Sequence, residues 1–180
     1  MRSITVHTRA LLSRCLFSWA ALSLAMVASG TQAQAQVREG TLAPELELRT
    51  LTGAPFKLSA LRRSPVVITF WGTWCPPCRS EFTELSAVYT KYRATGLQIV
   101  AVNQGDQERK VSDVHAFVDA LAVPFTVVLD PRGRSRRTYR LVGLPTTVFV
   151  DTAGVVRKVL SGPVSPESLA GGLATIGVVR

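Results

Sequence analysis

The sequence predicts an α/β domain in which a mixed β-sheet is flanked by helices. Short runs rich in β-branched and aromatic residues alternate with segments whose apolar residues recur at helical spacing, which indicates parallel strands joined by helices. A hairpin pattern lies on each side of this core and adds antiparallel strands. The 180 residues are 47% apolar and 18% charged, which excludes a disordered polar chain and suits one folded domain.

The first 35 residues have the pattern of a secretory signal peptide. Three arginines precede an apolar run (15–28), and the small-residue triplet Ala33-Gln34-Ala35 ends the segment. We therefore expect a signal over residues 1–35 and one domain over 36–180, with a periplasmic or extracytoplasmic location. An uncleaved inner-membrane anchor is the alternative for the first segment.

The elements of the expected domain follow from local patterns. Strands are predicted where β-branched runs are bounded by turn residues, and helices where apolar residues recur every three or four positions. Gly96 is expected to end the first helix, and Pro166 to lie in the first turn of the last one. The expected order is a hairpin (Glu45–Leu48 and Ala54–Leu58), a strand (66–71), a helix to Gly96, a strand (97–102), a helix (111–121), a strand (125–129), a hairpin (146–150 and 155–160) and a helix from about Ser165.

A cysteine pair lies where the first core strand ends and the first helix begins, in Trp74-Cys75-Pro76-Pro77-Cys78. Unpaired amides and the helix dipole stabilise a thiolate at such a position, so Cys75 is the expected nucleophile. Cys78, one turn later, is expected to be more buried and to resolve a mixed disulfide formed by Cys75.

Three interpretations compete with this one. Chance spacing with inert thiols is disfavoured by the position of the pair between a strand and a helix. A structural disulfide is possible in an exported protein, but so short a loop stabilises a fold by only about 2 kcal/mol. A zinc site would need two further ligands, and after residue 35 the chain has one histidine, His115, and no other cysteine. We expect no metal and no cofactor.

Two further residues are candidates for the site. Pro145, in Gly143-Leu144-Pro145-Thr146-Thr147, enters a predicted strand, where either a cis bond or an ordinary trans proline would fit. Glu81 follows Cys78 by three residues, so it is either a proton carrier for Cys78 or a solvated helix charge.

These motifs together resemble the TlpA/ResA-like thiol-disulfide oxidoreductases of the thioredoxin superfamily. The resemblance is carried by the segment 70–81, by Ala43-Pro44 and the early hairpin, and by the motifs 101–103, 127–130 and 143–147. It implies a thioredoxin fold with an N-terminal β-hairpin and a central β-α insertion, here about 103–131. Thr69 stands where thioredoxin itself has a buried aspartate, which moves any proton handling to Glu81 or water.

The resemblance also implies roles. Cys75 would be the nucleophile, Cys78 the resolving thiol, Pro145 a cis-proline beside them and Glu81 the acidic residue of the family motif. Trp74, Pro76 and Leu144, which adjoin these residues, are the candidate contacts for the substrate.

The implied activity is reduction of client protein disulfides, often in apocytochrome c haem sites or copper-site assembly proteins. A membrane thiol carrier of the CcdA or DsbD type would supply the electrons. We expect a monomer.

Other functions are weighed against this one. A thiol peroxidase of the peroxiredoxin kind shares the fold, but Gly72 stands where peroxiredoxins have a threonine. The sequence cannot distinguish a disulfide reductase from a disulfide oxidant or isomerase. The direction of electron transfer depends on small differences in the stability of the thiolate and the disulfide. The arginines between 132 and 140 could bind an anionic partner, but a solvated face is the simpler interpretation, and no nucleic acid is expected.

Overall fold

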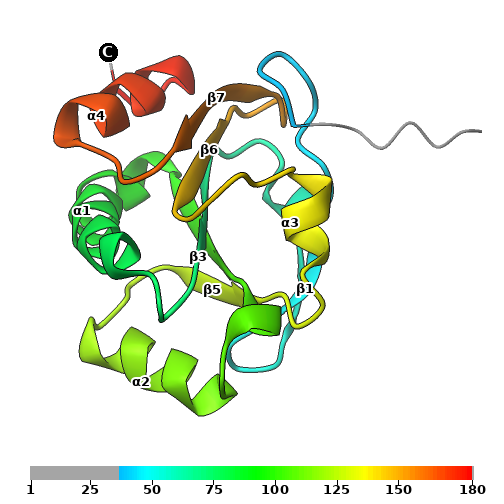
Figure 1. The fold of residues 1–180 in the computed structure, drawn as a ribbon. Coiled ribbons are helices and arrows are strands. Elements are labelled where there is room, and N and C mark those ends of the chain that lie inside the picture. Colours follow the sequence, from blue (N-terminus) through cyan, green and yellow to red (C-terminus); the bar gives the residue numbers. More distant parts are fainter. Residues whose placement is uncertain (1–36, 180) are drawn as a thin grey trace, which may run out of the picture. The chain divides into compact units, whose positions relative to one another are not determined.

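A computed structural model describes residues 37–179 and shows a seven-stranded mixed sheet flanked by helices (Figure 1). The predicted signal segment, residues 1–35, lies outside the described residues. Within 37–179, no helix has the length and apolar character that a membrane span requires. The predicted fold class is confirmed.

The sheet has the order β2-β1-β5-β4-β3-β6-β7. Its strands are β1 (Glu47–Thr50), β2 (Pro55–Lys57), β3 (Val66–Trp71), β4 (Gln98–Asn103), β5 (Thr126–Leu129), β6 (Thr146–Val150) and β7 (Val156–Ser161). Strands β3, β4 and β5 are parallel, and β1, β2, β6 and β7 add the antiparallel pairings. The carboxyl ends of β3, β4 and β5 therefore share one edge of the sheet.

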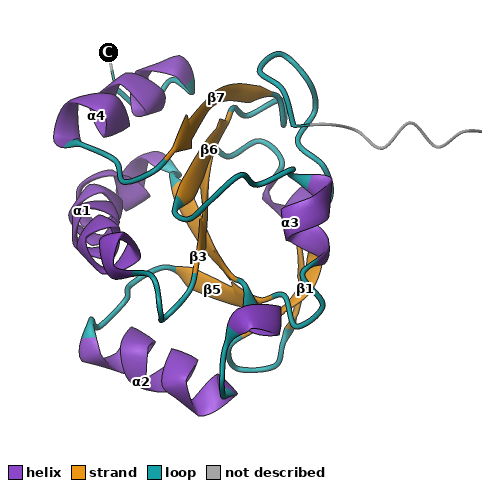
Figure 2. Ribbon diagram, viewed as in Figure 1, coloured by secondary structure: helices purple, strands orange, loops and turns teal. Residues whose placement is uncertain are grey.

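The two faces of the sheet are covered differently (Figures 1 and 2). One face packs against α1 (Pro76–Tyr92), α2 (Val111–Ala120) and α4 (Pro166–Thr175), which share a core cluster with both cysteines. The other face packs against Leu46 and Leu58, which flank the early hairpin, and against Tyr139, at the end of the short helix α3 (Arg134–Thr138). Short 3₁₀-helical turns follow β2 (Leu58–Leu61), α1 (Arg93–Thr95) and β4 (Gly105–Gln107).

Two expectations about local structure were wrong. The early hairpin begins two residues later than expected, because the Glu45 carboxylate accepts the backbone N–H groups of Leu46 and Ser59 and holds this segment outside the sheet. Helix α3 was not expected at all, since its arginines show no apolar periodicity. The predicted end of the first helical segment at Gly96 is confirmed by a left-handed backbone there, with φ of 90°.

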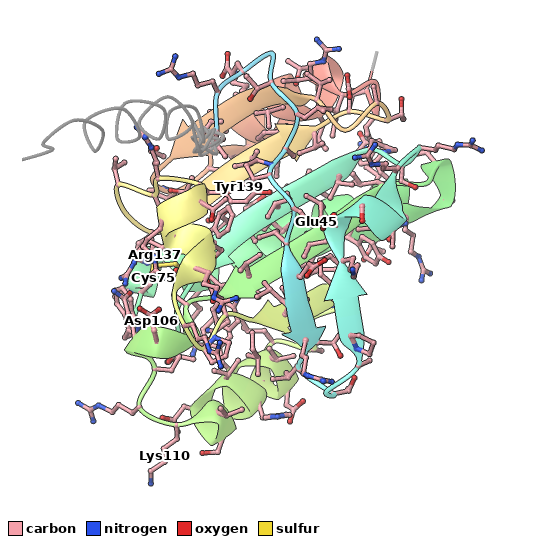
Figure 3. All side chains as sticks on the ribbon, turned by 90° about the vertical axis from the view of Figure 1, so that its right-hand side faces the viewer. Glu45, Cys75, Asp106, Lys110, Arg137 and Tyr139 are labelled. Carbon is pink, nitrogen blue, oxygen red and sulfur yellow. A yellow bond between two sulfur atoms is a disulfide. The ribbon has the colours of Figure 1, made fainter. Side chains whose placement is uncertain are left out.

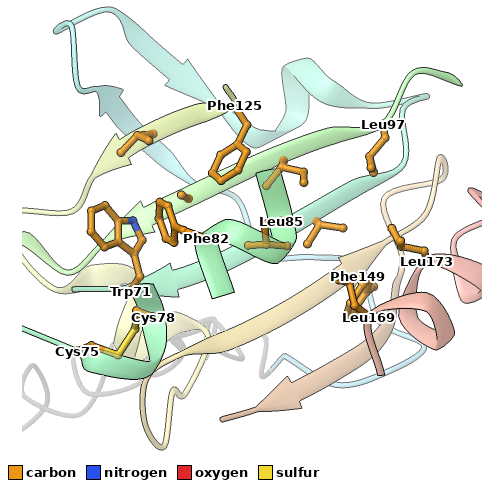
Figure 4. Packing of buried hydrophobic residues seen from close by; sticks show 14 of the residues in the cluster. Trp71, Cys75, Cys78, Phe82, Leu85, Leu97, Phe125, Phe149, Leu169 and Leu173 are labelled. Atoms are coloured by element: carbon orange, nitrogen blue, oxygen red, sulfur yellow. A yellow bond between two sulfur atoms is a disulfide. The ribbon is translucent and has the colours of Figure 1, made fainter. Parts of the chain in front are cut away.

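Aromatic packing fixes the start of α1 on the end of β3 (Figure 4). The Trp71 ring, at the last position of β3, lies 4.6 Å from the Phe82 ring of α1 and 4.7 Å from the Phe117 ring of α2. All three side chains are buried. Ring pairs at such distances add about 0.5–1.5 kcal/mol each to the burial of their surface. The loop between Trp71 and α1, which carries the cysteines, is therefore held at both ends.

Candidate functional site

Cys75 and Cys78 form a disulfide at the start of α1, with a Cα–Cα distance of 5.4 Å. Cys75 is the N-cap residue, and the N–H of Cys78 donates to its carbonyl at 3.1 Å. Cys78 is fully buried, whereas Cys75 keeps 4% of its surface exposed. Of the two sulfur-bearing residues, Cys75 is thus the one that another molecule can reach.

The location of Cys75 favours the thiolate form once the disulfide is reduced. No side chain caps the first turn of α1, so no other group occupies the N-cap position of Cys75. The positive end of the helix dipole stabilises an anion there. Two prolines follow Cys75 in the first turn, where a missing N–H is not a lost hydrogen bond.

Pro145 lies beside the cysteine loop, and the Leu144–Pro145 peptide bond is cis. The next residue, Thr146, pairs with Phe70 near the end of β3, which brings the proline to the same edge of the sheet as Cys75. Leu144 is half-buried and packs against the cluster that contains both cysteines. The cis bond that the resemblance implied is therefore present.

Glu81 is almost completely buried, with 2% of its surface exposed, so it is not a solvated helix charge. Its Oε1 accepts hydrogen bonds from the hydroxyls of Thr69, at 3.2 Å, and Thr147. Its Oε2 has no partner among the described residues. Burial raises the pKa of Glu81 to about 7, and the two hydroxyl donors oppose part of that shift.

This environment lets Glu81 exchange a proton near neutral pH. Residues three apart on a helix are neighbours, so its carboxyl group lies on the side of α1 that carries Cys78. Thr69, which cannot itself act as an acid or base near pH 7, serves here as a donor to the carboxylate. The helix thus carries one buried titratable group on the same face as the buried sulfur.

Glu108, which sequence analysis missed, holds the cysteine loop from the other side. Its carboxylate accepts the Thr73 backbone N–H at 2.7 Å, the Thr73 hydroxyl, and the Asn103 side-chain amide at 2.8 Å. Thr73 precedes Cys75 by two residues, so Glu108 fixes the approach to the nucleophile. No sequence signal could have found it, because it lies in a polar stretch without periodicity.

The remaining predicted contacts differ in exposure. Trp74 is 50% exposed and Pro76 is exposed, so both can meet another molecule. The Trp74 indole lies over Gly72, where an added Cβ would come within 2.8 Å of its Nε1. The glycine at this position therefore makes room for the tryptophan. Within residues 37–179, no three side chains of histidine, cysteine, aspartate or glutamate gather as metal ligands would.

Comparison with known proteins agrees with this geometry. The model of the AhpC/TSA family matches residues 40–159. The thiol-disulfide oxidoreductase ResA of Bacillus subtilis (strain 168) is 38% identical over 133 residues, which are 74% of this chain and 73% of that protein. ResA of Geobacillus thermodenitrificans (strain NG80-2) is 31% identical over 157 residues, 87% of this chain and 88% of that protein.

Solved structures show the same similarity. A putative thiol:disulfide interchange protein DsbE from Chlorobium tepidum superimposes with a TM-score of 0.72 at 34% identity, covering 79% of this chain and all of that one. StoA from Bacillus subtilis superimposes with a TM-score of 0.63 at 25% identity, covering 74% of this chain and 98% of that one. With its cysteine pair, Glu81 and the cis-proline at one edge of a thioredoxin-like sheet, the chain belongs to the AhpC/TSA family and, with the ResA proteins, to the thiol-disulfide oxidoreductases.

Proposed function

We propose that this thiol-disulfide oxidoreductase acts outside the cytoplasm and reduces disulfides of client proteins. The observation that carries the exchange chemistry is the Cys75–Cys78 disulfide at the start of α1, with its second sulfur buried beside a protonatable carboxylate. The signal pattern of residues 1–35 supports the location. The reductive direction is supported by the resemblance to the TlpA/ResA-like proteins.

The reaction begins with the reduced protein. The Cys75 thiolate attacks one sulfur of the client disulfide, a client thiolate leaves, and a mixed disulfide joins Cys75 to the client. The Cys78 thiol then loses its proton and attacks the Cys75 sulfur, which releases the second client thiolate. The client has gained two electrons, and the protein has formed the disulfide seen in the structure.

Glu81 supplies the proton step at the buried sulfur. Ionised Glu81 takes up the proton that the Cys78 thiol loses as it attacks, and it returns the proton when the disulfide is reduced again. A pKa of about 7 suits both directions, because neither form of the carboxyl group is strongly favoured at neutral pH. Leu144 packs against the cluster that contains both cysteines, and we propose that Leu144 and Pro145 contact the client strand there.

The partners that we propose follow from the same resemblance. Clients would be proteins whose cysteine pairs must stay reduced, such as apocytochrome c haem-binding sites or copper-site assembly proteins. A membrane thiol carrier of the CcdA or DsbD type would reduce the Cys75–Cys78 disulfide after each turnover.

The experiment is client capture from the native cell envelope. Cys78→Ser leaves the mixed disulfide on Cys75 unresolved, so we expect covalent complexes that reductant releases and mass spectrometry identifies. The matched Cys75→Ser variant should capture none. Equal capture by both variants, or capture through Cys78 alone, would contradict the assigned roles.

Two further assays separate the alternatives. Hydrogen peroxide consumption that needs Cys75 but not Cys78 would favour a thiol peroxidase. Two features argue against that activity: Gly72 stands three residues before Cys75, where peroxiredoxins have a threonine, and the hydroxyl of the nearby Thr73 is hydrogen-bonded to Glu108. Equilibration of the Cys75–Cys78 disulfide with glutathione tests whether the protein acts as a reductase or as an oxidant. A disulfide that glutathione reduces readily would favour an oxidant or isomerase over a reductase.

A further inference from the structure

The segment that joins β5 to β6 carries an unbalanced positive charge. Between positions 131 and 150 the sequence contains no aspartate or glutamate, yet it has five arginines: Arg132, Arg134, Arg136, Arg137 and Arg140. We call residues 132–140 the arginine segment. Clusters of one sign generate a local potential that attracts partners of the opposite sign.

Buried contacts hold the arginine segment in place. The Asp130 carboxylate accepts both the N–H and the hydroxyl of Ser135, at 2.7 and 2.6 Å. The Tyr139 hydroxyl donates to the Pro44 carbonyl at 2.6 Å, and its ring lies 4.8 Å from that of Phe70. The buried side of the segment is therefore fixed, and its arginines are presented by a rigid support.

Most of these arginines have no acidic partner. Arg136 forms an ion pair with Asp106 at 2.7 Å. Arg132, Arg134, Arg137 and Arg140 are exposed and form no ion pair with any residue in 37–179. Arg140 also has a left-handed backbone, with φ of 49°, which is uncommon for a side chain of this kind. Ion pairs within residues 37–179 thus leave most of the positive charge of the arginine segment uncompensated.

The arginine segment includes α3, which lies on the opposite face of the sheet from α1, but the segment ends at the same end of the sheet as the cysteines (Figure 1). It starts at the carboxyl end of β5 and must cross the ends of β4 and β3 before it enters β6 at the cis-proline. Cys75, Asp106 and Arg137 accordingly lie toward the same end of the sheet (Figure 3). Strands are about 4.8 Å apart, so the crossing spans on the order of 15 Å.

Exposed apolar side chains adjoin both the arginine segment and the disulfide. Val142, three residues before Pro145, is 87% exposed, and Trp74, next to Cys75, is 50% exposed. They are two of the four large apolar residues exposed in the described part of the chain. Apolar side chains near the sulfur pair, followed by the positive charge of the arginine segment, are suited to bind an extended polypeptide.

We propose that the arginine segment, with Val142 and Trp74, is the client-docking surface and selects clients whose reactive cysteine is accompanied by an acidic segment. This inference rests on the proposed reductase function and adds the chemistry of its substrate. Exposed charges act mainly on the rate of encounter, so the selection should appear in second-order rates at low salt.

The test uses three synthetic peptides with one Cys-Ala-Ala-Cys disulfide, extended by four aspartates, four serines or four lysines. The reduced protein is mixed with each peptide, and single-turnover rates are followed by acid quench. We expect the aspartate peptide to react roughly tenfold faster than the lysine peptide at low salt, with the difference largely lost near 0.5 M salt. Equal rates for the three peptides would overturn the proposal.

Charge-changing variants test whether the arginine segment causes the difference in rate among the peptides. Arg137→Glu combined with Arg140→Glu should remove most of the preference for the aspartate peptide, because the two remaining unpaired arginines, Arg132 and Arg134, then face two glutamates. The corresponding double glutamine variant should reduce the preference by a smaller factor. The control is Arg62→Glu combined with Arg93→Glu, since both residues are exposed and lie at the opposite end of the sheet. A control that reduces the preference as much as the first variant would contradict a local surface.

Two readouts distinguish client docking from a missing reductase activity and from a membrane partner. Reduction of the uncharged hydroxyethyl disulfide should be the same in all variants, and its absence in the wild type would refute the proposed function rather than the docking surface. Vesicles containing phosphatidylglycerol test a membrane as the partner. Vesicle binding that needs Arg137 and Arg140, without any preference among the peptides, would overturn the proposal.

Discussion

Replacing Glu81 by glutamine should remove a pH dependence of stability that the buried carboxyl group imposes. The ordinary pKa of a glutamate is 4.5, and burial raises that of Glu81 to about 7 in the folded protein. Between these values the folded state holds a proton that the unfolded state has lost. The contribution of Glu81 to stability is thus complete below pH 4.5 and is lost as the pH rises through about 7.

The size of the effect follows from the two pKa values. Each unit of difference corresponds to about 1.4 kcal/mol, so the oxidised wild type should lose about 3 kcal/mol of unfolding free energy between pH 4 and 8 relative to Glu81→Gln. The amide of the variant is neutral throughout, and its NH₂ group can occupy the place of Oε2, which lacks a partner among the described residues.

Urea unfolding of the oxidised proteins across this pH range measures the difference. Glu84→Gln, one turn further along α1 and half-buried, is the matched control and should follow the wild type in parallel. If Glu81→Gln and the wild type instead give parallel curves between pH 4 and 8, Glu81 ionises as readily in the folded state as in the unfolded one. The proton-transfer argument would then fail as well.

The other predictions concern single contacts. Thr147→Val removes a donor to the Glu81 carboxylate and should raise its pKa further, which ¹³C NMR of that side chain measures. Glu108→Ala leaves its three donors without an acceptor, so we expect a loss of about 2 kcal/mol in urea unfolding and slower client reduction, while glutamine restores part of both. Gly172→Ala should destabilise the protein by about 1–3 kcal/mol, because the added Cβ would lie 2.3 Å from the buried ring of Phe149. Gly171→Ala should be neutral or stabilising, because its Cβ would lie 3.6 Å from its nearest neighbour. Thermal melts of the two variants test this difference.

Sequence reasoning succeeded where one residue pattern determines one structure. The apolar run of β3 and the helical periodicity after Cys78 each allowed only one element, and both were found close to their observed bounds. The last helix was expected to start near Ser165, and in the structure Ser165 and Ser168 form a capping box there. These features depend on neighbours in the chain, which the sequence displays directly.

Sequence reasoning failed where contacts between residues far apart in the chain determine the local structure. Helix α3 is held against the fold by Tyr139, whose hydroxyl reaches the carbonyl of Pro44, 95 positions away. This contact leaves no local pattern. For Glu81 the sequence suggested a role but left its burial open, since Thr147 comes from a strand 66 positions away.

The two carboxylates beside the cysteine loop show how the number of donors separates two roles for one residue type. Glu108 receives three hydrogen bonds, one of them from a backbone N–H, so both of its oxygens have partners and the side chain is suited to hold a loop. Glu81 receives two bonds on one oxygen and none on the other, in a site that water hardly reaches. Because burial outweighs these two donors, the pKa of Glu81 rises to about 7, which suits a group that exchanges protons with Cys78.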